Sequence, residues 1–191
     1  YSIKGTLADY YSVIDKFNNA NMSLSEYANQ SLDKNYYEGM RIGEIWGFVS
    51  NGLWQDQAGI DAAEAAAKAA GQSYYNPLMQ TSKTYKLYPG DIKFEDLNGN
   101  GYIDRGQNMV DDPGDRKIIG NSTRRYQYGI HGGASWKGFS LSFLLQGVGK
   151  RDLWIMNDLF YPHYDAWTTV YDTQLNYWTP ERTDSYFPRL Y

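Results

Sequence analysis

Apolar and polar residues alternate most regularly between residues 126 and 149. Such alternation is typical of β-strands, because successive side chains point to opposite faces. In YQYGIHGGASW, one face carries Tyr126, Tyr128, Ile130, Ala134 and Trp136. In FSLSFLLQGVG, one face carries Phe139, Leu141, Phe143 and Leu145, and only Leu144 breaks the alternation. A two-residue turn at Lys137-Gly138 would pair the flanking residues, so the two apolar faces coincide and the pattern predicts an antiparallel hairpin.

Two kinds of protein would use this hairpin. Its strands, at about 123–136 and 139–149, have roughly the 9–11 residues that a tilted transmembrane β-strand needs. Aromatic residues at both ends of the apolar face are typical of the strands of outer-membrane β-barrels. A soluble antiparallel sheet that packs one face on a core gives the same alternation. The hairpin alone leaves both interpretations open.

The lengths of the connections favour the barrel. If Lys137-Gly138 is a short periplasmic turn, residues 55–122 and 150–191 both lie outside the cell. Long loops belong on that side of an outer-membrane barrel. We therefore expect extracellular loops over these two ranges.

The remaining elements are less regular. Residues 40–54 are rich in β-formers and predict a further strand, which ends at a Ser50-Asn51-Gly52 turn signal. Residues 60–70, IDAAEAAAKAA, predict a short helix within a loop, with few large apolar side chains to bury. Residues 1–37 are expected to be irregular, with short helical segments around 9–17 and 24–32.

A candidate metal site lies in the sequence DLNGNGYID at residues 96–104. It opens like the calcium loop of an EF-hand, with oxygen side chains at positions 1, 3, 5 and 9, a glycine at 6 and an apolar residue at 8. These positions are Asp96, Asn98, Asn100, Asp104, Gly101 and Ile103. Position 12, normally Glu, is Gln107, and the next carboxylates are Asp111, Asp112 and Asp115. The alternative is a turn without a metal, since Asn, Gly and Asp favour turns for backbone reasons.

Composition excludes several classes of function. A formal net charge of -4 gives no reason to expect nucleic acid as a partner. The chain has no cysteine, so a disulfide framework is excluded. Its histidines, His131 and His163, stand in no catalytic or zinc-binding motif, so we do not expect an enzyme. His131 falls on the polar face of its strand, where a lumen-lining role is favoured over metal binding.

Aromatic residues also crowd the segment between Trp154 and Trp178. They could stack on sugar rings or pack a long loop against its neighbours. Packing is favoured, because no polar residues at regular spacing mark a binding platform. The aromatic residues within this segment are Phe160, Tyr161, Tyr164, Trp167, Tyr171 and Tyr177.

Several motifs in a fixed order point to a family. They are YEGMRIGEIWGF, PGDIKFEDLNGNGYID, DDPGDRKIIGNS, RRYQYGIHGGASWKGFSLSFLLQGVGKRD and NYWTPERTDSYFPRLY. Over about residues 36–191 they resemble the C-terminal part of SusC/RagA-type TonB-dependent outer-membrane transporters of Bacteroidota. The resemblance implies a mainly β chain, with antiparallel strands and long loops from a barrel of the roughly 22-stranded class with a plugged lumen.

The resemblance also implies a function and a location. Residues 38–191 would be part of the barrel domain, with the plug domain, the TonB box and the final strands outside this chain. The transporter would lie in the bacterial outer membrane, surrounded by lipid bilayer. There it would import oligosaccharides or peptides with a SusD-like lipoprotein, driven through the TonB complex. The alternative is a soluble secreted β-domain that binds glycans and is braced by calcium.

The family resemblance extends to the metal loop. Asp96, Asn98, Asn100 and Asp104 match the Asp/Asn-rich loop of the family, in which Tyr102 would supply a backbone carbonyl. Many family loops pass directly from the ninth position to an Asp-Arg pair. Here residues 105–114 intervene before Asp115-Arg116. The resemblance makes Asp115 the first candidate for the closing calcium ligand and Asp112 the second.

Overall fold

The computed structural model describes residues 1–24, 36–72, 86–155 and 169–190. Within these residues the chain is mainly β, with antiparallel strands, as predicted. The strands are β1 (Ser2–Ala8), β2 (Glu44–Phe48), β3 (Ser50–Leu53), β4 (Ile92–Phe94), β5 (Arg116–Asn121), β6 (Arg125–Trp136) and β7 (Phe139–Lys150). The helices are α1 (Gln57–Ala69) and the short 3₁₀ helix η1 (Asp172–Leu175).

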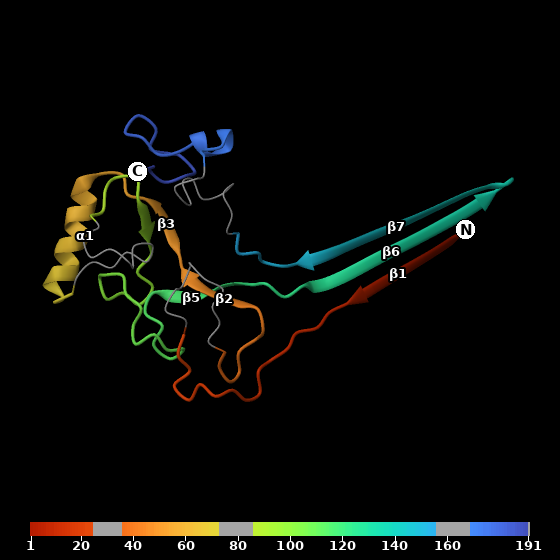
Figure 1. The fold of residues 1–191 in the computed structure, drawn as a ribbon, viewed down its shortest axis with the longest axis horizontal. Helices are drawn as coiled ribbons and strands as arrows, with labels where there is room; N and C mark the ends of the chain where they lie inside the picture. The colour runs from red at the N-terminus through yellow and green to blue at the C-terminus, as the bar shows by residue number, and fades with distance from the viewer. Residues whose placement is uncertain (25–35, 73–85, 156–168, 191) are drawn as a thin grey trace.

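The predicted hairpin is confirmed and is the longest element of the fold (Figure 1). β6 and β7 pair antiparallel, from Trp136 opposite Phe139 to Arg125 opposite Lys150. The backbone φ angles of Lys137 and Gly138 are 46° and 85°. Positive φ at both central residues is what a two-residue turn between twisted strands requires.

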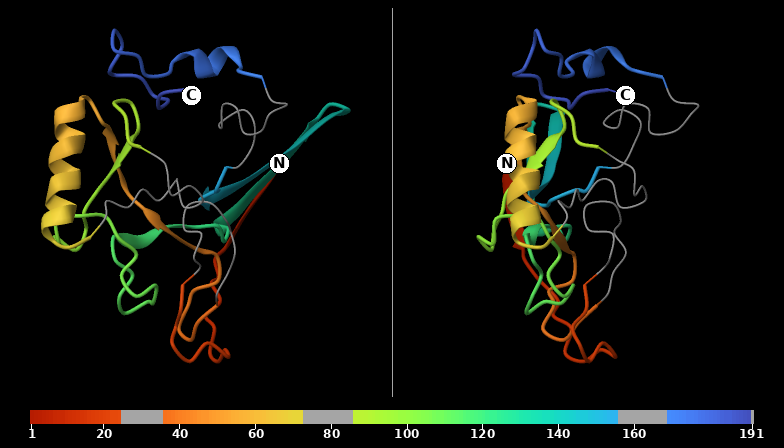
Figure 2. Two further views of the ribbon diagram at one scale, coloured as in Figure 1. Left: turned by 60° about the vertical axis from the view of Figure 1, so that its left-hand side comes forward. Right: turned by 90° about the vertical axis from the view of Figure 1, so that its left-hand side faces the viewer.

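A third strand completes this sheet, which has the order β1-β6-β7. β1 pairs antiparallel with β6, from Ser2 opposite Gly133 to Ala8 opposite Gln127. A long connection therefore joins β1 to β6, and a tight turn joins β6 to β7. The sheet extends as an arm from the remaining described residues, which we call the loop body (Figure 1, Figure 2).

The buried core lies in the loop body. Two short sheets, β2-β5 and β3-β4, give it a frame. One cluster consists of Phe48, Phe94 and Ile103, with the two phenyl rings edge to face at 5.7 Å. Ile103 thus anchors the predicted metal loop to buried residues, as its position in the loop suggests. The other clusters are Leu24, Tyr37 and Met40, and Trp54, Ile60 and Leu87.

Helix α1 confirms the predicted helix and begins a few residues earlier. Asp56 caps it, because its side chain accepts a hydrogen bond of 2.7 Å from the Gly59 amide. Ile60 and Ala67 are buried, so the helix attaches to the Trp54 cluster. Among the residues that the structure describes, no helix is long and apolar enough to cross a membrane.

The first 37 residues differ from the expectation of irregular and short helical structure. Residues 2–8 form β1, and residues 9–17 contain no helix. The expected helix at 24–32 falls almost entirely outside the described residues. In SIKGTLA, Ile3 and Leu7 alternate with polar residues, but seven residues are a weak signal when the partner strand lies more than 110 residues away.

Residues 40–54 also differ from the expected single barrel strand. They form β2 and β3, which pair with β5 and β4 inside the loop body rather than with β6 or β7. The register shifts between Ile45 and Trp46, and again between Ser50 and Leu53. Gly52 has a φ of 84°, outside the range of an extended strand. These irregularities divide the segment into two short strands.

Candidate functional site

The candidate metal loop connects β4 to β5 and turns sharply at two glycines. The φ angles of Gly99 and Gly101 are 74° and 90°. Both amides donate to the first carboxylate of the loop, Gly99 to Asp96 Oδ1 at 2.6 Å and Gly101 to Asp96 Oδ2 at 2.8 Å. Asp96 therefore holds the turn that brings the later positions back toward it.

The other predicted side chains continue this pattern. The amide of Asn100 donates to Asn98 Oδ1 at 3.0 Å, and the amide of Tyr102 donates to Asn100 Oδ1 at 3.0 Å. Asn100 Nδ2 donates to Asp104 Oδ2 at 2.5 Å. These hydrogen bonds connect Asn98, Asn100 and Asp104, whereas Asp96 is held by the amides of Gly99 and Gly101. Each of these amide or carboxylate oxygens accepts one of these hydrogen bonds and keeps a second lone pair.

Asp115 joins the two ends of the loop. Its side chain is fully buried, at 0% exposure. Asp115 Oδ1 accepts hydrogen bonds from the amides of Leu97 at 2.7 Å and Asn98 at 3.3 Å, and Oδ2 accepts one from Asp104 at 2.7 Å. Burial raises the pKa of Asp115, the three amide bonds oppose that rise, and the Asp104 charge adds to it. Sequence spacing gave no sign that this carboxylate accepts backbone hydrogen bonds.

Asp112 lies in the turn of the insertion. Its Oδ2 accepts a hydrogen bond of 3.3 Å from the amide of Gln107. The insertion folds back tightly, because side chains on Gly106 or Gly114 would overlap Asp112 and Asp104. Gln107, at the twelfth position, is exposed.

The donor set fits a hard cation. Carboxylates, amide oxygens and a backbone carbonyl are the ligands that calcium prefers. Among the residues with described placement, no three Asp, Glu, His or Cys side chains form a metal-binding group. An ion in this loop would therefore depend on the amide oxygens of Asn98 and Asn100 and on the carbonyl of Tyr102.

The second candidate site is the outer surface of the three-stranded sheet. We call one side of this sheet the apolar face. Phe139 is 79% exposed and Trp136 is 70% exposed, so the described residues leave these two large side chains mostly uncovered. The apolar face consists of Ile3, Leu7, Tyr128, Ile130, Ala134, Trp136, Phe139, Leu141, Phe143 and Leu145.

Two aromatic rings on the apolar face lie over glycines of the paired strand. Phe143 lies directly opposite Gly132, and Tyr128 lies opposite Gly147. A Cβ atom at either glycine would overlap the ring. Because glycine has no side chain, each ring can lie against the backbone of the paired strand.

The other side of the sheet, which we call the polar face, carries mostly small or hydrophilic side chains. The hydroxyls of Ser135 and Ser140 share a hydrogen bond of 2.8 Å. His131 is exposed on this face, as the alternation predicts. Ala8, Leu144 and Val148 are the apolar exceptions. The remaining members are Ser2, Lys4, Thr6, Gln127, Gly129, Gly133, Ser142 and Gln146.

An ion pair closes the end of the sheet at the loop body. Arg125 Nε and Nη2 donate to the two carboxylate oxygens of Asp9 at 2.5 and 2.6 Å. These bonds lower the pKa of Asp9 to about 2. The guanidinium groups of Arg125 and Arg41 lie 5.5 and 4.9 Å from the ring centre of Tyr11. Sequence reasoning missed this cluster, because its members lie far apart in the chain.

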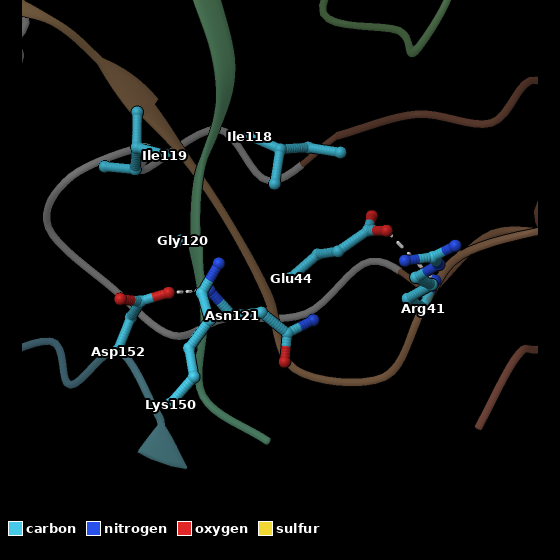
Figure 3. A pocket seen from close by; sticks show the side chains of 8 residues that line it. All are labelled: Arg41, Glu44, Ile118, Ile119, Gly120, Asn121, Lys150 and Asp152. Atoms are coloured by element: carbon cyan, nitrogen blue, oxygen red, sulfur yellow. Dashed lines mark hydrogen bonds between the residues drawn. The ribbon is translucent and has the colours of Figure 1, made fainter. Parts of the chain in front are cut away.

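A hollow of about 540 Å³ marks the junction of the sheet and the loop body (Figure 3). Its two carboxylates already accept backbone hydrogen bonds. Asp152 Oδ2 accepts the Asn121 amide at 2.7 Å, and Glu44 Oε1 accepts the Arg41 amide at 3.1 Å. We interpret this hollow as a structural joint between β5 and the end of β7.

The aromatic segment is described only in part. Phe160, Tyr161, Tyr164 and Trp167 lie outside the described residues. Trp178 is 4% exposed and lies against Gly90, where a Cβ would be 2.6 Å from the indole. The amide of Arg189 donates to the Gly90 carbonyl at 2.9 Å. At this end of the segment the structure shows packing between loops.

Comparison with known proteins relates the chain to a bacterial receptor. No family model matches the chain. The chain is 28% identical over 153 residues to "TonB-dependent receptor P3" of Formosa agariphila. The match covers 80% of this chain but only 12% of that protein. The chain is therefore distantly homologous to a small part of a TonB-dependent receptor.

Proposed function

We propose that the chain is part of a SusC/RagA-type TonB-dependent transporter in a bacterial outer membrane. In this proposal β1, β6 and β7 are neighbouring strands of the barrel wall, and the loop body is extracellular. The complete protein imports glycans or peptides with a SusD-like lipoprotein and is powered through TonB. The distant homology to a TonB-dependent receptor supports a transporter rather than an enzyme.

The exposed apolar face is the observation that carries this proposal. Burying one large apolar side chain is worth about 1.5–3 kcal/mol, so leaving a whole face in water is costly. β6 and β7 each have 12 residues, enough to cross the apolar part of a bilayer when tilted. Lipid would cover the apolar face while the polar face lines the barrel interior.

The connections support the proposed orientation. Lys137-Gly138 is the only connection at the far end of the described sheet, whereas β1, β6 and β7 all meet the loop body at the near end (Figure 1). Outer-membrane barrels have short periplasmic turns and longer extracellular loops. The loop body, with its candidate metal loop, would thus lie outside the cell.

Leu144 and Leu145 provide a matched test of lipid contact. They are adjacent, similarly exposed at 58% and 57%, and lie on opposite faces. The chain has no cysteine, so Leu144→Cys or Leu145→Cys gives this region a single thiol for a fluorescent label. The full-length protein is reconstituted in vesicles with lipids brominated on their acyl chains. We expect quenching of the label at 145 and little at 144, and equal quenching would contradict the barrel assignment.

We also propose a structural calcium ion in the loop. Its ligands are Asp96, Asn98, Asn100, Asp104 and the carbonyl of Tyr102. Asp115 Oδ1 already accepts two hydrogen bonds, so only Oδ2 has a lone pair to offer. Asp115 would therefore close the site through one oxygen at most, and Asp112 remains the second candidate.

A further inference from the structure

The three-stranded sheet contains basic residues but no acidic ones. Lys4, Arg125 and Lys150 lie within β1, β6 and β7, whose sequences include no Asp or Glu. All 22 acidic residues of the chain lie elsewhere, although the chain as a whole has a net charge of -4. The sheet is therefore a positively charged region in an acidic chain.

Two long side chains in the middle of the polar face have no polar partner among the described residues. Lys4 on β1 lies directly opposite His131 on β6. Within the described residues, neither side chain has a hydrogen-bond or ion-pair partner. The positions beside them in the register pair Ser2 with Gly133 and Thr6 with Gly129, which leaves the Lys4 ammonium and the His131 imidazole accessible.

A hollow of about 470 Å³ lies on the sheet near the loop body. Gly129 lies between Thr6 and Gln146 in the register, and the Thr6 hydroxyl donates a hydrogen bond of 3.4 Å to the Gly129 carbonyl. The polar residues of its lining are Thr6, Gln127, Gln146 and the exposed Arg124, and Leu7 and Tyr128 of the apolar face also contribute to it. These polar residues offer a hydroxyl, two amides and a guanidinium, and no carboxylate lines the hollow.

The nearest carboxylates do not neutralise these groups. Asp9 binds Arg125 through both oxygens, and Asp152 accepts the Asn121 amide. Within the described part of the chain, the Arg124 guanidinium has no acidic partner. Its donors, and the ammonium of Lys4, therefore remain available to a ligand.

We propose that the polar face binds an anionic, hydroxyl-rich oligosaccharide. Arg124 would hold a carboxylate or sulfate group by charge-assisted hydrogen bonds, and Lys4 would attract the next acidic group along the passage. Thr6, Gln127 and Gln146 would bind sugar hydroxyls. This inference rests on the proposed function, in which the polar face lines the path of the imported solute.

The test compares oligosaccharides that differ mainly in charge. Binding of tetragalacturonate, its neutral methyl ester and a sulfated tetrasaccharide to the full-length protein in detergent is measured by calorimetry. We expect at least one acidic probe to bind about tenfold more tightly than the ester, the effect of one charge-assisted contact. Arg124→Gln and Lys4→Gln should each remove much of this preference. Lys117→Gln, at an exposed position on β5, is the control and should change nothing.

Two results would overturn the inference. Either acidic and neutral probes bind equally, or the preference survives in Arg124→Gln. The relative affinities of the carboxylated and sulfated probes distinguish the two kinds of acid. The lipid-quenching experiment on Leu144 and Leu145 reports the barrel assignment independently. Quenching at 145 without preference for an acidic probe would leave the transporter in place and remove the substrate class.

Discussion

The three-stranded sheet and the loop body use their apolar residues in opposite ways. In the sheet, alternation is regular and the apolar side chains are exposed. In the loop body, strands are short and interrupted, yet all three buried clusters lie there. The loop body can thus hold much of its structure through its own contacts, whereas the described residues leave the apolar face of the sheet exposed. A regular alternation of apolar and polar residues therefore does not show by itself which region is stabilised by its own buried contacts.

The largest effect on stability is expected when a charge is placed on each face of the sheet in turn. Leu145→Lys on the apolar face should destabilise the reconstituted full-length protein by about 2–4 kcal/mol, the cost of a Lys near the bilayer midplane. Leu144→Lys on the polar face should cost much less, because its ammonium would reach water. Denaturant unfolding in lipid vesicles measures both. Similar losses would show that lipid does not distinguish the two faces.

The next test addresses the loop body through calcium. If the dissociation constant is about 10⁻⁴–10⁻³ M, 10 mM calcium should stabilise the loop by about 1.4–2.7 kcal/mol. Asp96→Asn should remove most of this stabilisation, because a neutral amide replaces a charged ligand. Thermal unfolding of the loop, followed by hydrogen exchange in calcium and in chelator, measures the effect.

Two further variants separate calcium binding from loop architecture. Asp111→Asn, at an exposed position outside the ligand set, should leave the calcium response intact. Asp115→Asn should weaken the loop even in chelator, since it disturbs a buried carboxylate that accepts three amide hydrogen bonds. The proposed ion site is wrong if calcium changes nothing in the unsubstituted protein.

A smaller effect concerns the rings that lie over glycines. Gly132→Ala should displace the Phe143 ring and cost about 1–3 kcal/mol, with the lower end expected because the ring can move toward lipid. Gly133→Ala is the control, because its Cβ would meet only ordinary contacts, the nearest at 3.4 Å. Denaturant unfolding of the reconstituted protein compares them. Equal stability of the two variants would show that the Phe143 ring does not depend on the space above Gly132.

The smallest effect concerns the Asp9–Arg125 pair at the border of the two regions. The pKa of Asp9 is depressed to about 2, so the pair stabilises the fold at pH values above the ordinary aspartate pKa near 3.9. This contribution is lost as the pH falls toward 2. Asp9→Asn should therefore speed amide exchange in β1 at pH 5 but not at pH 2. A difference that persists unchanged at pH 2 would contradict this role.

Local signals in the sequence predicted the elements whose causes are local. The hairpin follows from period-two alternation around Lys137-Gly138, and α1 follows from an alanine-rich run that Gly71 ends. The loop at Asp96 was predicted because its oxygens recur at fixed spacing. These features need no information about distant parts of the chain.

Long-range contacts explain what the sequence did not reveal. β1 was missed because Ser2–Ala8 is short and its partner strand is more than 110 residues away. Asp115 was expected to be an ion ligand, but its amide bonds to Leu97 and Asn98 depend on how the insertion folds back. Trp178 against Gly90 likewise depends on tertiary packing.

The pairing of β1 with β6 has a consequence for the order of folding. Asp9 and Arg125 lie 116 positions apart, so closing this loop from a flexible chain costs about 4 kcal/mol of entropy. The β6–β7 hairpin has only a two-residue loop to close. The hairpin should therefore form early, and β1 should join last. Folding of the loop body beforehand would bring the two ends together and remove much of that cost, so the loop body would act as a folding aid for the three-stranded sheet.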